Sequence, residues 1–169
     1  MIITGRQLAR LIELNELVRG FIDLKTQLQP HGFDLTVREV QRLEESGRVD
    51  FDNRQRRVPR GTPIPWPGEW LHLGPGAYRV LFNEVLNMPP DLAAMGRPRS
   101  SLVRSGVALH TSVWDAGYRG RSEALLSVLN PAGFDLGRNA RILQLVFFRL
   151  DQQVLMEDAY SGQYQQENL

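Results

Sequence analysis

The chain has 169 residues, 42% of them hydrophobic, which suits one globular domain with a sizeable core. Its 20 basic and 19 acidic residues leave a net charge of +1, so no global field recruits nucleic acid, and an anionic ligand needs a local basic cluster. The absence of cysteine excludes disulfides, thiolate catalysis and cysteine-bound zinc, while no apolar run approaches the roughly 20 residues of a membrane span.

The first 20 residues predict one amphipathic helix. Apolar side chains recur at helical spacing, at Leu8, Leu11, Ile12, Leu14 and Leu17. Thr4 is suited to cap this helix and Gly20 to end it. Charges also come too early here for a signal peptide. We therefore expect an N-terminal helical segment over residues 1–27 of a cytoplasmic protein, with neither nucleic acid nor a membrane as a partner.

Beyond this segment the helical period disappears, and short runs rich in Val, Ile, Phe and Leu follow, separated by Pro and Gly. The runs are FDLTVREVQRL, EWLHL, YRVLFNEVL, GVALHTSV, ALLSVL and RILQLVFFRL. Six such runs predict an all-β barrel or jelly roll. The segment Val58–Gly68 holds four prolines and cannot donate to a central ladder. The run ILQLVFF is apolar on both faces, which predicts an interior strand, with a subunit contact as a further possibility.

A basic cluster lies between two glycines in the run GRPRSSLVRSG, residues 96 to 106. It contains Arg97, Arg99, Arg104, Ser100, Ser101 and Ser105. Guanidinium forks and hydroxyl groups bind phosphate oxygens well, and glycine lets the backbone approach them. The alternative is a solvated basic loop, which the composition of the run favours equally.

The run SVWDAGYRGR places Asp115 nine residues after Gly106 and five before Gly120. Asp and Gly are common turn residues, so local chemistry favours a structural role. A carboxylate close to a phosphate clamp would, however, be repelled by its ligand unless a cation or a water molecule lay between them. That arrangement is typical of a base that activates water for attack on phosphorus.

The tail YSGQYQQENL is polar and short of apolar anchors. We expect residues 158–169 to form a mobile C-terminal arm. The whole chain, residues 1–169, is then a single domain.

These runs together resemble a known family. The segments LQPHGFDL, LGPGAY, PPDLAAMGRPRSSLVRSGV, WDAGYRG, GRNARILQLVF and YSGQYQ follow one another as they do in the dUTP pyrophosphatase and dCTP deaminase superfamily. The resemblance covers about residues 28 to 165 and is closest to the short archaeal-type dUTPases. It implies a distorted jelly-roll β-barrel that assembles as a homotrimer, with nucleotide sites between subunits.

The resemblance also implies roles for individual residues. It places Arg99, Ser100, Ser101, Arg104 and Gln144 on phosphate oxygens. Asp115 matches the catalytic aspartate, which deprotonates a water molecule that attacks the α-phosphorus of dUTP and so releases dUMP and pyrophosphate. Asp34 matches an aspartate that supports the metal and the site geometry. The implied cofactor is Mg²⁺, held mainly by substrate phosphates and water.

Further roles concern the nucleoside. The resemblance implies that Tyr118 packs on the deoxyribose and disfavours a 2′-hydroxyl. The backbone of the hairpin is expected to recognise the pyrimidine edge, along His110, Thr111, Ser112, Val113 and Trp114. The C-terminal arm is expected to close over the nucleotide with Tyr160, Gln163 and Tyr164. The sequence departs from the common pattern in having Gly117 where many dUTPases carry a second acid.

Hydrolysis of dUTP and deamination of dCTP share this scaffold, so the fold does not choose between them. Deaminases of the family carry a glutamate five residues after the hairpin glycine, and here that position is Leu125. Glu123 is the nearest acid, and an exposed strand residue is the simpler interpretation of it. We therefore expect a Mg²⁺-dependent dUTP pyrophosphatase. The alternatives are a dCTP deaminase, alone or bifunctional, and a catalytically silent trimer that binds deoxynucleoside triphosphates.

Overall fold

The structure is a computed structural model of the chain and describes residues 1–155 and 157–169. The helices are α1 (Gly5–Asn15), α2 (Leu24–Gln27) and α3 (Ser100–Arg104). The strands of the first half are β1 (Val18–Arg19), β2 (Leu28–Gln29), β3 (Gly32–Leu43), β4 (Gly61–Pro63), β5 (Trp70–Leu73), β6 (Gly76–Phe82) and β7 (Val85–Asn87). Those of the second half are β8 (Leu92–Pro98), β9 (Val107–His110), β10 (Val113–Trp114), β11 (Arg119–Gly120), β12 (Glu123–Val128), β13 (Phe134–Gly137) and β14 (Arg141–Arg149).

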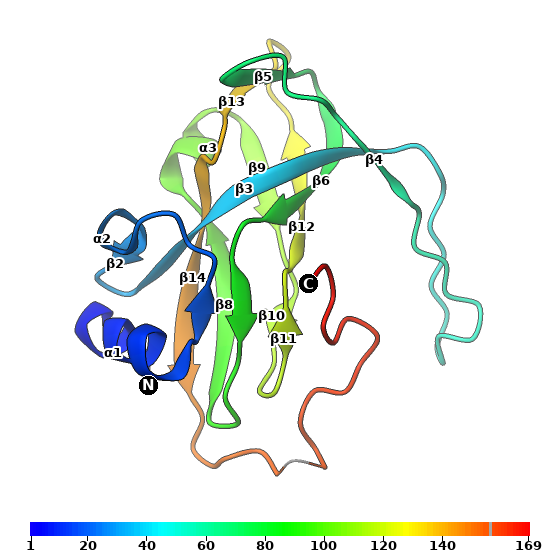
Figure 1. Cartoon of the computed structure of the whole chain (residues 1–169). Helices are drawn as coiled ribbons and strands as arrows, with labels where there is room; N and C mark the ends of the chain where they lie inside the picture. Colours follow the sequence, from blue (N-terminus) through cyan, green and yellow to red (C-terminus); the bar gives the residue numbers. More distant parts are fainter. Residues whose placement is uncertain (156) are drawn as a thin grey trace.

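One curled antiparallel sheet dominates the molecule (Figure 1). Its strands run in the order β10-β8-β14-β3-β6-β12-β9, with β2 and β4 paired to β3. The two ends of this path, β9 and β10, are neighbours in the chain and are joined by only Thr111 and Ser112. The sheet therefore curls until its ends meet, and we call the connection Thr111–Ser112 the seam. This arrangement confirms the predicted all-β, barrel-like fold.

The predicted β runs are confirmed with two corrections. The first is GVALHTSV, which the seam divides between β9 and β10. The run RILQLVFFRL forms β14, which pairs with β3 on one side and β8 on the other, as expected for an interior strand. The proline-rich segment contributes only the short edge strand β4. The run YRVLFNEVL does not form one strand, because the chain leaves β6 at Asn83 and Glu84 turns inward before β7 begins.

Glu84 is the centre of a buried polar network that fixes α2 and β3. Its carboxylate accepts hydrogen bonds from the Gln27 side chain (2.6 Å), the Thr36 backbone N–H (2.9 Å) and the Thr36 hydroxyl (2.6 Å). Burial raises the pKa of Glu84, and these hydrogen bonds oppose the rise. The break between β6 and β7 is thus set by a tertiary contact that a pattern of apolar residues does not reveal.

The N-terminal helix is shorter than the sequence predicted. It ends at Asn15, because Glu16 adopts a left-handed conformation (φ 52°) and the backbone N–H of Leu17 turns back to the carbonyl of Leu11. Residues Val18–Arg19 then pair with β7 as strand β1. Thr4 precedes the helix as predicted but makes no side-chain capping bond; its carbonyl accepts the N–H of Leu8 instead.

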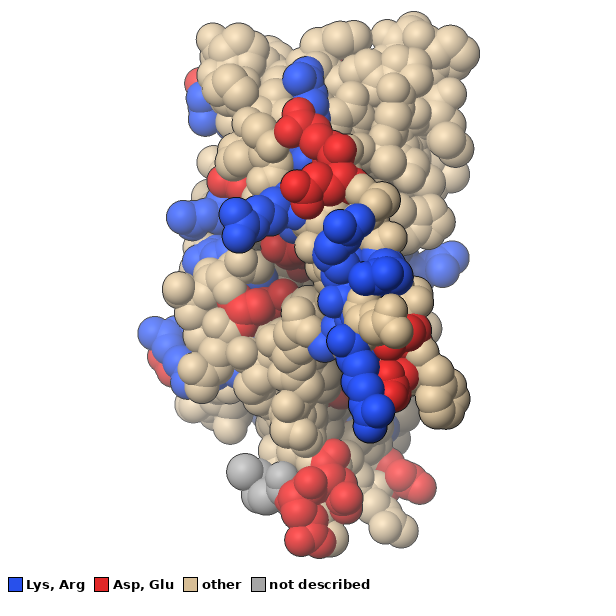
Figure 2. Space-filling view, turned by 90° about the vertical axis from the view of Figure 1, so that its right-hand side faces the viewer, with Lys and Arg blue, Asp and Glu red and all other residues tan. Residues whose placement is uncertain are grey.

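Basic and acidic side chains are interspersed on the face shown in Figure 2, where a column of Lys and Arg is flanked by Asp and Glu. This agrees with the net charge of +1. Within the described ranges, none of the helices combines the length and apolar character that a bilayer crossing requires.

Candidate functional site

The predicted hairpin that carries Asp115 is a turn between β10 and β11, which pair with β8 and β7 and not with each other. We keep the name hairpin for residues 113–120. Trp114 is buried, and its indole N–H donates to the Ser122 hydroxyl (2.6 Å). The N–H of Tyr118 donates to the Asp115 carbonyl (3.2 Å), and Gly117 takes a positive φ of 86° at the turn. Asp115 is therefore a turn residue, as its local chemistry indicated. Its side chain remains exposed, with no hydrogen-bond partner for the carboxylate among the described residues.

Gly117 is required by its surroundings as well as by its φ angle. A Cβ atom at this position would lie 2.8 Å from the Cβ of Ala159, in the segment that leads into the C-terminal arm. A second acid, which many relatives of the predicted family carry here, would collide with that segment. The departure from the family pattern therefore has a packing cause.

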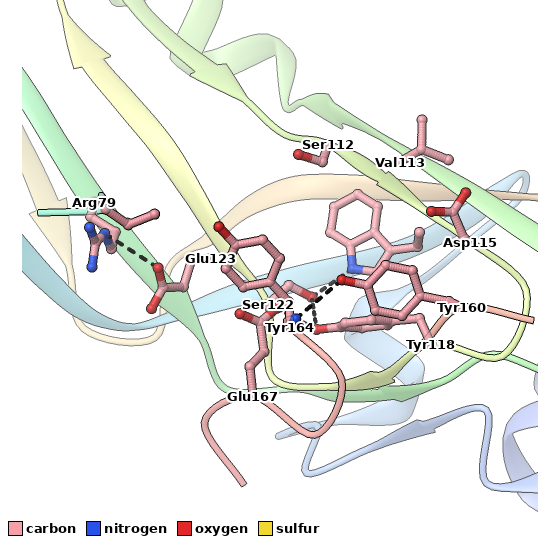
Figure 3. Close-up of a pocket in the computed structure, with 12 residues that line it drawn as sticks. Arg79, Ser112, Val113, Asp115, Tyr118, Ser122, Glu123, Tyr160, Tyr164 and Glu167 are labelled. Carbon is pink, nitrogen blue, oxygen red and sulfur yellow. Dashed lines mark hydrogen bonds and ion pairs between the residues drawn. The ribbon is translucent and has the colours of Figure 1, made fainter. Parts of the chain in front are cut away.

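A cavity of about 420 Å³ opens beside this turn, and we call it the seam cavity. Its lining comes from Val58, Arg79, Ser112, Val113, Trp114, Asp115, Tyr118, Ser122, Glu123, Tyr160, Tyr164 and Glu167. Figure 3 shows Asp115 at one end and Arg79 with Glu123 at the other, with Tyr118 between them. The hairpin, strand β6 and the C-terminal arm thus converge on one cavity.

Tyr118 forms a fixed wall of the seam cavity. Its hydroxyl donates to the Glu167 carboxylate (2.8 Å), and its ring packs edge-to-face against Tyr160 at a centroid distance of 5.7 Å. The Ser122 hydroxyl lies 3.4 Å from the Tyr118 oxygen. Burial raises the pKa of Tyr118 well above its usual value, so the phenol stays neutral and offers a flat apolar ring.

Glu123 is not the freely exposed strand residue that the sequence suggested. It lies at the start of β12 with its side chain 31% exposed, and its Oε2 pairs with the Arg79 Nε at 3.3 Å. Its Oε1 accepts a hydrogen bond from the Asn168 side chain (3.3 Å). Arg79 also donates from Nη2 to the Pro59 carbonyl (2.6 Å). Both carboxylate oxygens of Glu123 are therefore engaged.

The Arg79–Glu123 pair separates the seam cavity from a second cavity of about 370 Å³. The second cavity is lined by Leu43, Arg79, His110, Thr111, Ser112, Glu123, Ala124 and Leu125. The five residues predicted to recognise the pyrimidine are thus divided between the two neighbouring cavities. His110 and Thr111 line the second cavity, Val113 and Trp114 line the seam cavity, and Ser112 lines both.

The predicted phosphate-binding residues form a different group, around Asp34. The Asp34 Oδ2 lies 3.3 Å from the Arg99 Nη1 and 3.2 Å from the Arg141 Nη1, and the side chain is 1% exposed. Burial raises the pKa of Asp34, while the two guanidinium groups oppose the rise. We call Asp34, Arg99 and Arg141 the arginine cluster. It holds Arg99 in place at the start of α3.

The remaining phosphate candidates adjoin the arginine cluster. Gln144 lies opposite Asp34 in the β14–β3 register, and Ser100, Ser101 and Arg104 are exposed on α3. None of these residues lines the seam cavity or the second cavity. Figure 1 shows α3 toward one end of the molecule and β10 and β11 toward the other. A single chain therefore does not bring the two predicted halves of the site together.

The C-terminal arm packs against the hairpin of its own chain. The N–H of Tyr160 donates to the Ala116 carbonyl, that of Gln166 to the Arg119 carbonyl, and the Glu167 carbonyl accepts from the Arg121 N–H. The arm thus has anchors that its composition did not reveal, and its predicted mobility stays a prediction. Tyr160 and Tyr164 line the seam cavity, whereas Gln163 instead bonds the Arg56 side chain.

Glu167 brings a carboxylate into the same cavity. Burial raises its pKa, the hydrogen bond from Tyr118 opposes the rise, and the nearby charge of Glu123 adds to it. Sequence reasoning missed Glu167 because it lies in a polar tail without periodicity. It missed Arg79 because a single basic residue in the run YRVLF looks like the solvent face of an alternating strand.

The described part of the chain gathers no group of three His, Cys, Asp or Glu side chains that could hold a metal ion. Mg²⁺ commonly binds through one or two carboxylates together with substrate phosphates and water. The exposed Asp115 carboxylate fits that kind of site, whereas Asp34, already paired with two arginines, does not serve as a free ligand.

Comparisons with known proteins identify relatives of this chain. A family model described as dCTP deaminase-like matches residues 2–150. A protein of Methanosarcina mazei named probable deoxyuridine 5′-triphosphate nucleotidohydrolase is 50% identical over 99% of this chain and 98% of its own length. A protein of Methanosarcina acetivorans with the same name is 48% identical over the same shares.

A solved structure shares the fold. The 2′-deoxycytidine 5′-triphosphate deaminase of Agrobacterium tumefaciens superposes with a TM-score of 0.69 at 22% identity, over 91% of this chain. This chain spans about half of that deaminase chain, 49% of its length. The family match and the full-length archaeal relatives together show that this chain belongs to the dCTP deaminase-like family, which includes the dUTPases that its motifs resemble.

Proposed function

We propose that this protein hydrolyses dUTP to dUMP and pyrophosphate in the cytoplasmic nucleotide pool. One observation carries the proposal. Within the described residues, Asp115 has an exposed, unpartnered carboxylate that lines a cavity walled by Tyr118, on a hairpin that hydrogen bonds fix in place. The full-length relatives of the chain are named for this activity. A carboxylate in this setting is available to accept a proton from water.

The chain's own residues would divide the work as follows. Asp115 orients a water molecule and takes its proton as the oxygen attacks the α-phosphorus, and pyrophosphate leaves. Tyr118 provides the flat wall for the deoxyribose, because its hydroxyl is turned away into hydrogen bonds with Glu167 and Ser122. A 2′-hydroxyl packed against that ring would be buried without a partner, which disfavours ribonucleotides.

The phosphate-binding half would come from a neighbouring copy. Arg99, held by Asp34, together with Ser100, Ser101, Arg104 and Gln144, offers the charge that a triphosphate requires. The seam cavity of the same chain presents three carboxylates, Asp115, Glu123 and Glu167, against one arginine. This mismatch within one chain supports a homotrimer with sites between subunits.

Mg²⁺ would be held mainly by triphosphate oxygens and water, and it would neutralise charge that develops on the phosphates. Asp115 is the side chain that would face the ion, while Arg99 and Arg104 would contact phosphate oxygens that the ion does not bind. Neither the ion nor its coordination is needed to explain how the hairpin positions Asp115.

Deamination of dCTP is the second candidate, alone or combined with hydrolysis. It requires an acid that activates water at the pyrimidine ring. The nearest one, Glu123, has one oxygen paired with Arg79 and the other bonded to Asn168, so both of its oxygens already have partners. Leu125, on the same face of β12, offers no proton-accepting group. Both features support the hydrolase.

The test is to incubate purified protein and Mg²⁺ separately with dUTP and dCTP while pyrophosphate and ammonia are assayed together. We expect pyrophosphate from dUTP and no ammonia from dCTP. Ammonia from dCTP would replace the proposal with a deaminase. Tight dUTP binding without turnover would instead identify a silent nucleotide-binding trimer.

A further inference from the structure

Arg79 and Glu123 lie side by side on the wall between two cavities. Strand β12 pairs with β6 so that Leu125 is opposite Arg79 and Glu123 is opposite Leu81. Arg79 and Glu123 are therefore diagonal neighbours on one face of the sheet, and both line the seam cavity and the second cavity. An ion pair with side chains only 17% and 31% exposed is an unusual lining for an open wall.

The order of groups along the seam cavity indicates which part of a bound nucleotide would lie beside Arg79 and Glu123. In Figure 3, Asp115 lies at one end, Tyr118 follows, and Glu123 and Arg79 lie at the far end. A nucleotide with its reacting phosphorus at Asp115 and its sugar on Tyr118 would direct its base toward Arg79. Ser112 lines the seam cavity, and together with Thr111 it also lines the second cavity beyond the pair.

The pair leaves one hydrogen-bond donor without a partner among the described residues. Both oxygens of Glu123 are engaged, by the Arg79 Nε and by Asn168. The Arg79 Nη2 donates to the Pro59 carbonyl, and its Nη1 has no partner within the described residues. A guanidinium keeps its charge at every physiological pH, so this N–H group is always a donor.

Uracil and cytosine differ in what they offer to such a donor. Uracil carries an oxygen at position 4, which accepts a hydrogen bond. Cytosine carries an amino group there, which would face the guanidinium donor-to-donor. Discrimination of this kind is strong, because the unfavourable partner leaves buried polar groups unpaired.

We propose that Arg79, oriented by Glu123, is the specificity-determining residue that selects uracil over cytosine through the 4-oxo group. This inference rests on the proposed function, since it takes the seam cavity as the nucleotide site. Arg79 would contact the base, and Glu123 is a positioning residue that acts through Arg79.

The test measures base preference by binding, so that it does not depend on hydrolysis. The affinities of dUMP and dCMP are compared by calorimetry for the wild-type protein, Arg79→Gln and Glu123→Gln. We expect wild type to prefer dUMP, and Arg79→Gln to lose about 10- to 100-fold of that preference, the range for a hydrogen bond to a charged group. Glu123→Gln should lose less of the preference for dUMP. A variant that combines Arg79→Gln and Glu123→Gln should match Arg79→Gln alone, because the two residues act as one unit.

Two further variants guard the interpretation. Arg42→Gln removes an exposed arginine from the adjacent strand β3, where Arg42 lies opposite Tyr78 and lines neither cavity, and it should keep the wild-type preference. Arg79→Lys keeps the charge but not the fork, and it should show an intermediate preference. If Arg79→Gln unfolds, Arg79→Lys and Glu123→Gln carry the test.

The outcomes separate this inference from the proposed function. The inference would be overturned if the preference for dUMP survives in Arg79→Gln. If that variant unfolds, survival of the preference in both Arg79→Lys and Glu123→Gln would overturn it. A wild-type protein without any preference would overturn it as well. A preference that Arg79 controls in a protein without dUTP hydrolysis would overturn only the proposed function.

Discussion

The seam cavity and the arginine cluster differ in charge, in shape and in how their side chains are held. The seam cavity is a hollow whose charged lining residues are acidic apart from Arg79, and one of its walls is a C-terminal arm held by hydrogen bonds at its surface. The arginine cluster is built around a buried carboxylate, and it adjoins a short helix that presents exposed basic and hydroxyl side chains. One region suits a nucleoside and a water molecule, and the other suits phosphates. Under the proposed function each region would supply what the other lacks, so a complete site would need two copies of the chain.

The largest expected effect concerns Asp115, the proposed catalytic base. Replacing Asp115 with Asn removes the proton acceptor but keeps the shape of the turn, so the rate of dUTP hydrolysis should fall by about 10² to 10⁴ while nucleotide affinity stays within a few-fold. Steady-state kinetics and calorimetry measure the two quantities. Full activity in this variant would exclude Asp115 as the base.

The proposal that the Asp115 half and the Arg99 half of one site come from different subunits can be tested by mixing variants. Asp115→Asn and Arg99→Gln should each be poorly active alone. If each site takes Asp115 from one subunit and Arg99 from the next, refolding them together should restore about a quarter of wild-type activity, the share of intact interfaces in a randomly mixed ring.

The matched control mixes Arg99→Gln with Arg104→Gln, which both alter the phosphate-binding half. This mixture should not exceed the mean activity of its components. Complementation that fails in the first mixture, with both variants folded and assembled, would place the whole site within one subunit.

Asp34→Asn tests how the arginine cluster is organised. It removes the charge that holds two guanidinium groups, and we expect the free energy of unfolding to fall by about 2 kcal/mol, within the range for hydrogen bonds to charged groups. Triphosphate affinity should fall more than dUMP affinity, because Arg99 would lose its fixed position. Denaturant unfolding and calorimetry provide the measurements, and equal losses for both nucleotides would argue against this role.

The smallest expected effect concerns the arm. The pKa of Glu167 is raised above its ordinary value of 4.5 while the arm is packed, mainly by burial and further by the charge of Glu123. A group with a raised pKa stabilises the packed form fully below its ordinary pKa and loses that contribution as pH rises through the shifted value. Release of the arm, followed by limited proteolysis, should therefore increase as pH rises from about 4.5 toward neutrality. Glu167→Gln should flatten this dependence, and an unchanged profile would rule out Glu167 as its source.

The strands of the barrel could be predicted because their runs are rich in β-branched and aromatic residues. Strand β8 was missed, since LAAMGRP has little β propensity and is a strand only because β14 and β10 pair with it. The predicted helix overran by several residues for the same reason, because β7 recruits Val18 into a strand. In the candidate site, the family resemblance predicted Asp115 and Tyr118, and both line the seam cavity. The partners Arg79 and Glu167 come from distant segments, and only the folded chain places them together.

The pairing of β3 has a consequence for how this protein emerges from the ribosome. One edge of β3 pairs with β6 about forty residues later. On the other edge Gln41–Leu43 pair early with β4, but Phe33–Thr36 pair there only with β14, which is synthesised after more than a hundred residues. At about 5 to 20 residues per second, that edge stays open for several seconds or longer. During this interval the apolar face of β3 and its unpaired backbone groups are open to other chains. Because β14 is synthesised late, the incomplete chain has to be protected from aggregation at this edge. During synthesis, aggregation at the open edge is therefore a greater risk than low stability of the folded protein.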